Sequence, residues 1–67
     1  MVAKVERILQ RLDVITEPEQ MNLPGYRFHS LSGNRKGFWS VTVNGNWRVI
    51  FRFADGLPHD VELIDYH

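Results

Sequence analysis

The sequence predicts an α+β fold in which one amphipathic helix packs on an antiparallel sheet of three to four strands. Apolar residues recur at helical spacing through residues 2–15, and the chain after residue 25 consists of short runs rich in aromatic and β-branched residues. Glycine, asparagine and proline separate these runs, as they do in the turns of antiparallel sheets. A helix with one apolar side needs a surface to cover, and the sheet supplies it.

The first element is a helix with charged residues on its exposed side. After it, Thr16 followed by Pro18 predicts an N-cap and a short helical turn that ends near Met21. Pro24 and Gly25 then predict a tight turn, because proline presets one dihedral angle and glycine tolerates positive φ.

Four runs predict strands at residues 26–31, 38–43, 47–53 and 61–66. A two-residue Asn44-Gly45 turn in the middle hairpin would place Trp47 opposite Thr42. A three-residue loop instead puts every apolar residue on one face, with the pairs Val43–Trp47, Val41–Val49 and Trp39–Phe51. We expect the second arrangement and a core that includes Leu9, Leu12, Trp39, Val41, Val49 and Phe51.

The other face of the sheet is then open, and it shows Ser40, Thr42, Arg48, Ile50 and Arg52. If Tyr26 and Phe28 join the core, Arg27 and His29 share this open face. Arginine presents a fixed fork of donors to phosphate oxygens, so the face is a candidate phosphate site. A lone histidine on a strand is more often a hydrogen-bonded structural residue, which keeps the evidence for catalysis weak at this point.

Composition indicates a small globular protein. Of its 67 residues, 43% are hydrophobic, 12% aromatic and 24% charged, so we expect one domain over residues 1–67 with a stability of about 3–5 kcal/mol. The absence of cysteine excludes a disulfide scaffold and a thiolate metal site. No apolar run approaches the roughly 18 residues of a membrane span, and no leader opens the chain, so we expect a cytoplasmic protein without membrane contact.

Charge is unevenly distributed although the formal net charge is zero. Residues 55–67 contain four acids and neither lysine nor arginine. Residues 21–54 contain no acid and five basic side chains: Arg27, Arg35, Lys36, Arg48 and Arg52. A basic block on a neutral chain favours a polyanion such as RNA or DNA, although a solvated sheet face would have the same composition.

Two stretches, LPGYRFHSLSGNRKGFWSVTVNGNWRVIFRF and the terminal VELIDYH, resemble the HigB-type killer toxins of bacterial toxin–antitoxin modules, within the RelE/ParE superfamily. The resemblance covers about residues 21–67, and the NWR hairpin with the DYH ending is its most specific part. It implies a ribosome-dependent mRNA endonuclease that needs no cofactor or metal. It also implies that a HigA-like helix-turn-helix antitoxin silences the enzyme.

The resemblance implies catalytic roles for His29, Arg48, Asp65, Tyr66 and His67. A histidine would act as base or acid while the ribose 2′-hydroxyl attacks phosphorus, and Arg48 would stabilise the developing negative charge. Asp65 would orient a histidine, and Tyr66 would stack on a base or position the phosphate. Strand alternation would separate Tyr66 from its two neighbours, so the last strand should end before Tyr66 or the site should lie at a sheet edge. If the ending were structural alone, Tyr66 would be a last core contact and Asp65 a solvated acid.

The implied RNA-binding residues are Arg27, Arg35, Lys36 and Arg52. Ser32 stands where family members usually carry a lysine, so one phosphate contact is lost or passes to Arg35 or Lys36. Family members usually open with an additional strand and helix, and the resemblance leads us to expect a chain that is shortened by these two elements. We expect the sheet edge exposed by this loss to self-associate or to recruit a partner.

Three other functions compete with the nuclease. One is a non-catalytic module that binds the antitoxin or acts as a co-repressor. The gyrase-poisoning branch of the superfamily is disfavoured, because the terminal histidine signature belongs to the RNA-cleaving branch. Outside any family, a small RNA-binding domain would stack bases on Tyr26, Trp39 or Trp47, and this alternative weakens if those rings lie in the core.

Overall fold

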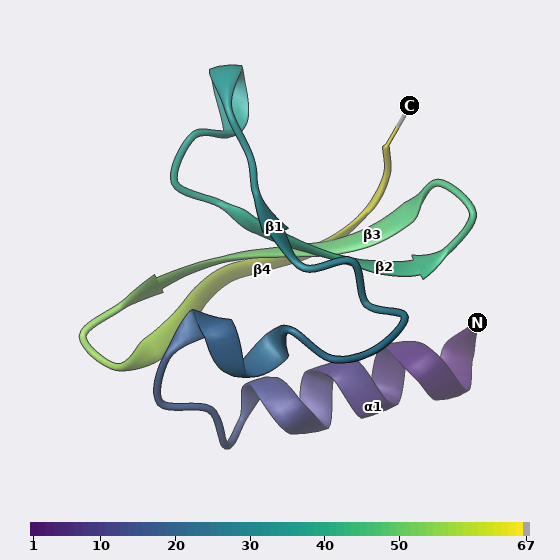
Figure 1. Ribbon diagram of the computed structural model, residues 1–67, viewed down its shortest axis with the longest axis horizontal. Coiled ribbons are helices and arrows are strands. Elements are labelled where there is room, and N and C mark those ends of the chain that lie inside the picture. Colours follow the sequence, from purple (N-terminus) through teal and green to yellow (C-terminus); the bar gives the residue numbers. More distant parts are fainter. Residues whose placement is uncertain (67) are drawn as a thin grey trace.

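One helix covers one face of a four-stranded antiparallel sheet, which confirms the predicted α+β class (Figure 1). The computed structural model describes residues 1–66. Its sheet order is β1-β2-β3-β4, and two short 3-10 helices lie in the connections. The elements are α1 (Val2–Leu12), η1 (Pro18–Met21), β1 (His29–Ser30), η2 (Gly33–Arg35), β2 (Trp39–Asn44), β3 (Trp47–Ala54) and β4 (Leu57–Asp65).

The segment after α1 differs in detail from the prediction. The short helical turn is present as η1, but its N-cap is Glu17 and the predicted cap at Thr16 is wrong. The reason is local: a residue that precedes proline is restricted to extended backbone, and Glu17 has φ −152° and ψ 152°. The helix therefore begins at Pro18. Thr16 instead donates its backbone N–H to the Gln20 side-chain oxygen, at 2.6 Å.

The β2–β3 hairpin keeps two of the three predicted pairs. Trp39 lies opposite Phe51 and Val41 opposite Val49, as expected, but Trp47 pairs with Asn44 and not with Val43. The register shifts between Thr42 and Asn44, so a bulge absorbs the odd residue and the turn shortens to two residues. The predicted Val43–Trp47 pair is therefore wrong.

Strand β4 begins four residues earlier than predicted. Asp55 and Gly56 have φ of 55° and 76°, the positive values that a type I′ turn requires at both central positions. This tight turn pairs Ala54 with Leu57, so the segment expected to be a loop is strand. A second bulge follows near Asp60, which has φ 51°. By contrast, the first predicted strand, at residues 26–31, shrinks to the two residues of β1.

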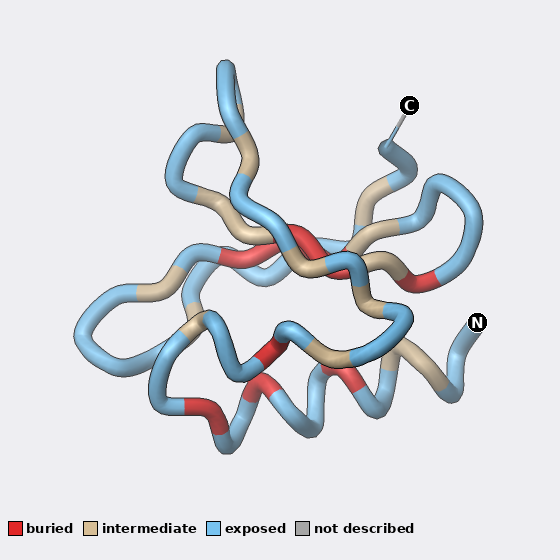
Figure 2. The backbone as a smooth tube through the Cα atoms, in the orientation of Figure 1, coloured by how far each residue is buried: buried red, intermediate tan, exposed pale blue. Residues whose placement is uncertain are grey.

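The core lies between the helical segments and the two central strands (Figure 2). Phe28 and Trp39 are partly buried against it, with stacked rings 4.9 Å apart. Tyr26 packs there too, which counts against an RNA-stacking platform on Tyr26 and Trp39. Leu9 is 43% exposed and its predicted core position is wrong. The buried members of this core are Ile8, Leu12, Ile15, Met21, Val41, Val43, Val49 and Phe51.

The face away from α1 is less open than expected at its centre. Ser40 and Ile50 lie opposite each other on this face, and their exposed fractions are 1% and 0%. Arg48 and Arg52 lie two residues to either side of Ile50 on β3 and therefore share its face. This face thus consists of a buried centre with cationic residues around it.

Candidate functional site

His29 lies on β1 opposite Ser40, on the face away from α1. The side chain is exposed, and its Nδ1 lies 2.9 Å from the backbone oxygen of Arg27. A carbonyl oxygen only accepts hydrogen bonds, so Nδ1 is the donor in this contact. The other ring nitrogen, Nε2, is the one that does not take part in the contact, so it is the atom that could act as a general base.

Arg48 lies on the same face, on β3, opposite Thr42 on one side and Ile64 on the other. It is partly buried, and its Nη1 donates to the backbone oxygens of Gly45 at 2.7 Å and Trp47 at 3.3 Å. These bonds fix the guanidinium at the tip of the hairpin. Since the group has five N–H donors, the other nitrogens remain available to an anion.

His29 and Arg48 are near each other but not in contact. They are separated by two strand spacings across the sheet and two residues along it. These spacings place their Cα atoms about 12 Å apart. The Thr42 hydroxyl, on the strand between them, is buried and has no hydrogen-bond partner among the described residues.

The last strand ends one residue before the end of the predicted range, residues 61–66. Strand β4 ends at Asp65, which is one of the two alternatives that the sequence left open, so Tyr66 is free of the strand alternation. The backbone N–H of Tyr66 donates to the oxygen of Asn46 in the hairpin turn, at 2.8 Å. In Figure 1 this terminus and the loop that contains η2 both rise on the side of the sheet opposite α1.

A polar pocket joins these two segments. Its volume is about 350 Å³, and it is lined by Ser32, Asn34, Arg35 and Tyr66. Arg35 is partly buried, and its guanidinium makes no bond to another described residue. Ser32 and Asn34 were not identified as site residues from the sequence. The only signal for them was their position in a polar, glycine-bounded loop beside basic residues.

The structure does not bring every predicted residue to this face. Asp65 lies opposite Trp47 in register, so alternation places it on the side of the sheet that carries Val49. That side is opposite to the one that carries Arg48. His67 lies outside the described residues.

The other basic residues predicted to bind RNA differ in their contacts and exposure. Arg52 is engaged, with its Nε 3.8 Å from Asp60 and its guanidinium 4.7 Å from the centre of the Phe38 ring. Lys36 is exposed next to η2, and Arg27 is exposed with φ 49° before β1. Arg35 is therefore the predicted RNA-binding residue that lines the polar pocket.

Among residues 1–66, no three His, Cys, Asp or Glu side chains are grouped closely enough to hold a metal ion. Within the same residues, no helix is long and apolar enough to cross a membrane.

Comparison with known proteins identifies the family. A family model described as the RelE-like HigB toxin of type II toxin–antitoxin systems matches residues 1–67. The chain is 39% identical over 66 residues to the protein named Endoribonuclease HigB of Proteus vulgaris, a match that covers 98% of this chain and 72% of the relative. It is 40% identical over 52 residues to Toxin HigB-1 of Vibrio cholerae serotype O1, which covers 76% of this chain and 55% of that protein. The chain belongs to the HigB-like toxin family, the RelE-like toxins of type II toxin–antitoxin systems.

Proposed function

We propose that the protein is an endoribonuclease that cuts mRNA on the ribosome and thereby inhibits translation in the cytoplasm. The name of the Proteus vulgaris relative, an endoribonuclease 39% identical to this chain, supports this activity. The face away from α1 supports it independently, because it combines an exposed histidine with arginines that can hold a phosphate.

The convergence of three segments carries the proposal. The η2 loop, the β2–β3 hairpin tip and the chain terminus meet around Tyr66, which contacts Asn46 through its backbone and lines the pocket with Arg35. Arg48 is fixed at the same hairpin tip. A phosphodiester seated there would have arginines on two sides and the Tyr66 ring beside it.

The reaction that suits these groups needs no metal. A base removes the proton of the ribose 2′-hydroxyl, O2′ bonds to the adjacent phosphorus, and the P–O5′ bond breaks with a proton returned to O5′. Arg48 stabilises the negative charge that develops on the phosphorane oxygens. His29, with Nε2 unprotonated, serves as a base, and His67 serves as the complementary acid or base. Asp65 orients His67, its near neighbour in the chain.

Arg35 makes the phosphate contact that a lysine at position 32 would make in other family members. Serine at position 32 contributes only a hydroxyl, whereas Arg35 lines the same pocket and brings a guanidinium. The Tyr66 ring stacks on a base or sets the position of the phosphate, because aromatic side chains are the usual platform for an unstacked base. Lys36, Arg27 and Arg52 add weaker contacts to the RNA backbone.

The partner is an antitoxin, since toxins of type II systems are paired with one. We propose that it is of the HigA-like helix-turn-helix kind. A non-catalytic module that only binds this antitoxin, or acts with it as a co-repressor, is the second candidate. The exposed apolar side chains along β4 favour it, because they indicate a surface that a partner covers.

Incubation of purified protein with mRNA, with and without ribosomes, tests the proposal. Primer extension should reveal new 5′ ends only when ribosomes are present, and those ends should carry a 5′-hydroxyl opposite a 2′,3′-cyclic phosphate. If the folded protein leaves mRNA intact on ribosomes yet binds its antitoxin, the nuclease is rejected in favour of the binding module. Products with a 5′-phosphate would reject the mechanism.

A further inference from the structure

The short strand β1 forms a regular ladder with β2 where the two are paired. His29 lies opposite Ser40. Two residues further along the chain, Leu31 donates its backbone N–H to the oxygen of Phe38 at 2.9 Å. In an antiparallel ladder every second pair exchanges hydrogen bonds. The next hydrogen-bonded pair is therefore expected two residues before His29.

The ladder is broken at that next pair. The same register would put Arg27 opposite Thr42, and the Arg27 oxygen would accept the Thr42 N–H. Instead the Thr42 N–H donates to the oxygen of Tyr26, at 2.6 Å. Two residues, Tyr26 and Arg27, thus stand opposite one, which is the arrangement of a β-bulge. The bulge releases the Arg27 oxygen from the ladder.

The released oxygen has a partner in the candidate site. It lies 2.9 Å from Nδ1 of His29. A carbonyl oxygen only accepts hydrogen bonds, so Nδ1 donates in this contact. In the neutral ring, the proton is then on Nδ1 and the lone pair is on Nε2. The bulge thereby determines which ring nitrogen of His29 can take a proton from a substrate.

The backbone conformation at the bulge is unusual for its residue type. Arg27 has φ 49°. The other non-glycine residues with positive φ among residues 1–66 are Asp55 and Asp60, and aspartate tolerates this region better than most residues do. Arginine has no such preference, so the surrounding structure must hold Arg27 in this conformation. Backbone held in a sparsely populated region is concentrated at functional sites, and bulges beside such sites re-aim side chains.

We propose that Arg27 is a positioning residue that acts through its backbone: the bulge frees its carbonyl oxygen from the ladder, and that oxygen fixes the His29 ring with Nε2 as the base. This inference rests on the proposed nuclease function and deepens it. The Arg27 side chain is exposed and is not needed for this role.

Two substitutions at position 27 separate the backbone from the side chain. Arg27→Gly and Arg27→Val both remove the guanidinium, so they lose the same contact with RNA. Glycine adopts positive φ freely, whereas a β-branched residue at positive φ is a genuine outlier. Arg27→Asn is a further control, because asparagine tolerates the left-handed region.

Nuclear magnetic resonance of the ring nitrogens tests the geometry without RNA. At alkaline pH, where the ring is neutral, His29 should carry its proton on Nδ1 in the unmodified protein, in Arg27→Gly and in Arg27→Asn. In Arg27→Val a larger share of the protons should move to Nε2, because the carbonyl oxygen is no longer held beside the ring.

Cleavage on ribosomes tests the consequence for the reaction. The maximal rate should be about 10- to 10²-fold lower in Arg27→Val than in Arg27→Gly, because a misdirected base slows the chemical step. The ribosome concentration at half the maximal rate should be the same in both variants. Arg27→Asn should cleave like Arg27→Gly, and thermal unfolding should show that all three variants are folded.

A neutral His29 that carries its proton on Nε2 in the unmodified protein overturns the proposal, and this result needs no variant to fold. Equal maximal rates for folded Arg27→Val and Arg27→Gly also overturn it. Because the ring measurement uses no RNA, failure of the nuclease and failure of the positioning role appear in different experiments.

Discussion

The two faces of the sheet differ in what they bury. The face under α1 buries Val41, Val49 and Phe51, and no ionisable side chain belongs to the described core. The opposite face carries His29 and Arg48 around a small buried centre. Because side chains alternate along a strand, each strand contributes to both faces, and a change at one residue leaves the other face largely in place.

This division separates stability from chemistry. Substitutions on the covered face should lower the free energy of unfolding, and substitutions on the opposite face should lower the cleavage rate with little change in stability. A residue that contributes to both stability and catalysis should lower both when it is replaced. Arg48 is such a residue, since its hydrogen bonds to Gly45 and Trp47 also support the hairpin turn.

The largest effect is expected for Phe51→Ala on the covered face. Phe51 is fully buried, so its truncation should cost about 3–5 kcal/mol through lost burial and a cavity. A domain of this size has about that much stability in total, so the variant should be largely unfolded at 25 °C. Circular dichroism during urea titration measures this. Val14→Ala, at an exposed site, should change the free energy of unfolding by less than about 0.5 kcal/mol. If Phe51→Ala stays folded, the assignment of the core is wrong.

Arg48→Gln tests the opposite face. We expect the cleavage rate on ribosomes to fall about 10²- to 10³-fold, because one preorganised donor to the developing charge is lost. The loss of its turn hydrogen bonds should cost only about 1 kcal/mol of stability. Arg7→Gln makes the same change of charge on α1 and should leave the rate within about twofold. A rate loss that merely follows the fraction unfolded would assign Arg48 to the fold.

A smaller effect is expected at the polar pocket. Arg35→Gln should reduce cleavage about tenfold, whereas Lys36→Gln, one residue further and outside the pocket, should reduce it by less than about threefold. Single-turnover rates at saturating ribosome concentration separate the two variants. Equal losses at both positions would mean that the loop contributes only diffuse positive charge.

The smallest effect should come from Arg52→Gln. The pair of Arg52 with Asp60 joins side chains that are 53% and 65% exposed, at 3.8 Å. Exposed ion pairs of this kind contribute less than about 1 kcal/mol, and salt screens them. The free energy of unfolding should therefore change little at low salt and not at all at high salt. A loss much above 1 kcal/mol would show that its contact with the Phe38 ring matters more than the ion pair.

Periodicity predicted the elements and the central core because both depend on local spacing. It placed Val41, Val49 and Phe51 on one face, and this result is confirmed. It left open whether the last strand ends before Tyr66, and the structure has the end at Asp65. The errors fall where one residue changes the register. The bulge at residue 43 gave Trp47 a different partner, and the positive φ of Asp55 started β4 early.

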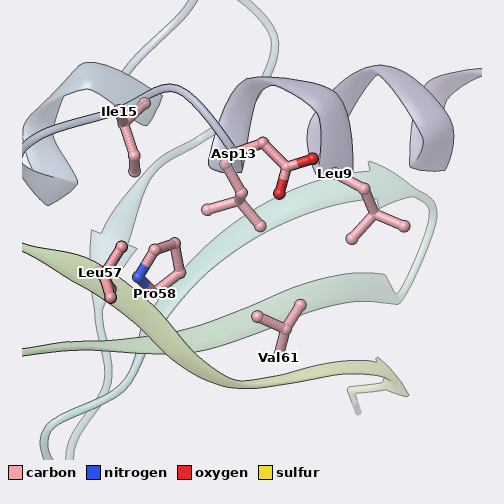
Figure 3. Close-up of a pocket in the computed structure, with 7 residues that line it drawn as sticks. Leu9, Asp13, Ile15, Leu57, Pro58 and Val61 are labelled. Atoms are coloured by element: carbon pink, nitrogen blue, oxygen red, sulfur yellow. The ribbon is translucent and has the colours of Figure 1, made fainter.

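The site was less predictable because it depends on segments that meet only in the folded chain. The polar pocket lies between the η2 loop and Tyr66. Ser32 and Asn34 become pocket residues only because the fold brings them to Tyr66, which is more than thirty residues away in the sequence. The exposure of Leu9 also follows from tertiary structure. Its spacing in the helix is that of a core residue. Because α1 does not cover the edge strand β4, Leu9 is exposed and lines the groove between α1 and β4 (Figure 3).

Deletion of His67 is the measurement that tests the assignment of chemistry to the opposite face and the terminus most directly. The cleavage rate on ribosomes and the melting temperature should be measured on the same preparation. We predict that the rate falls about 10²- to 10⁴-fold, because a general acid or base is lost. Removal of one terminal residue should change the melting temperature by only a few degrees. Undiminished cleavage by the shortened protein would contradict a catalytic terminus and leave His29 as the histidine that performs the chemistry.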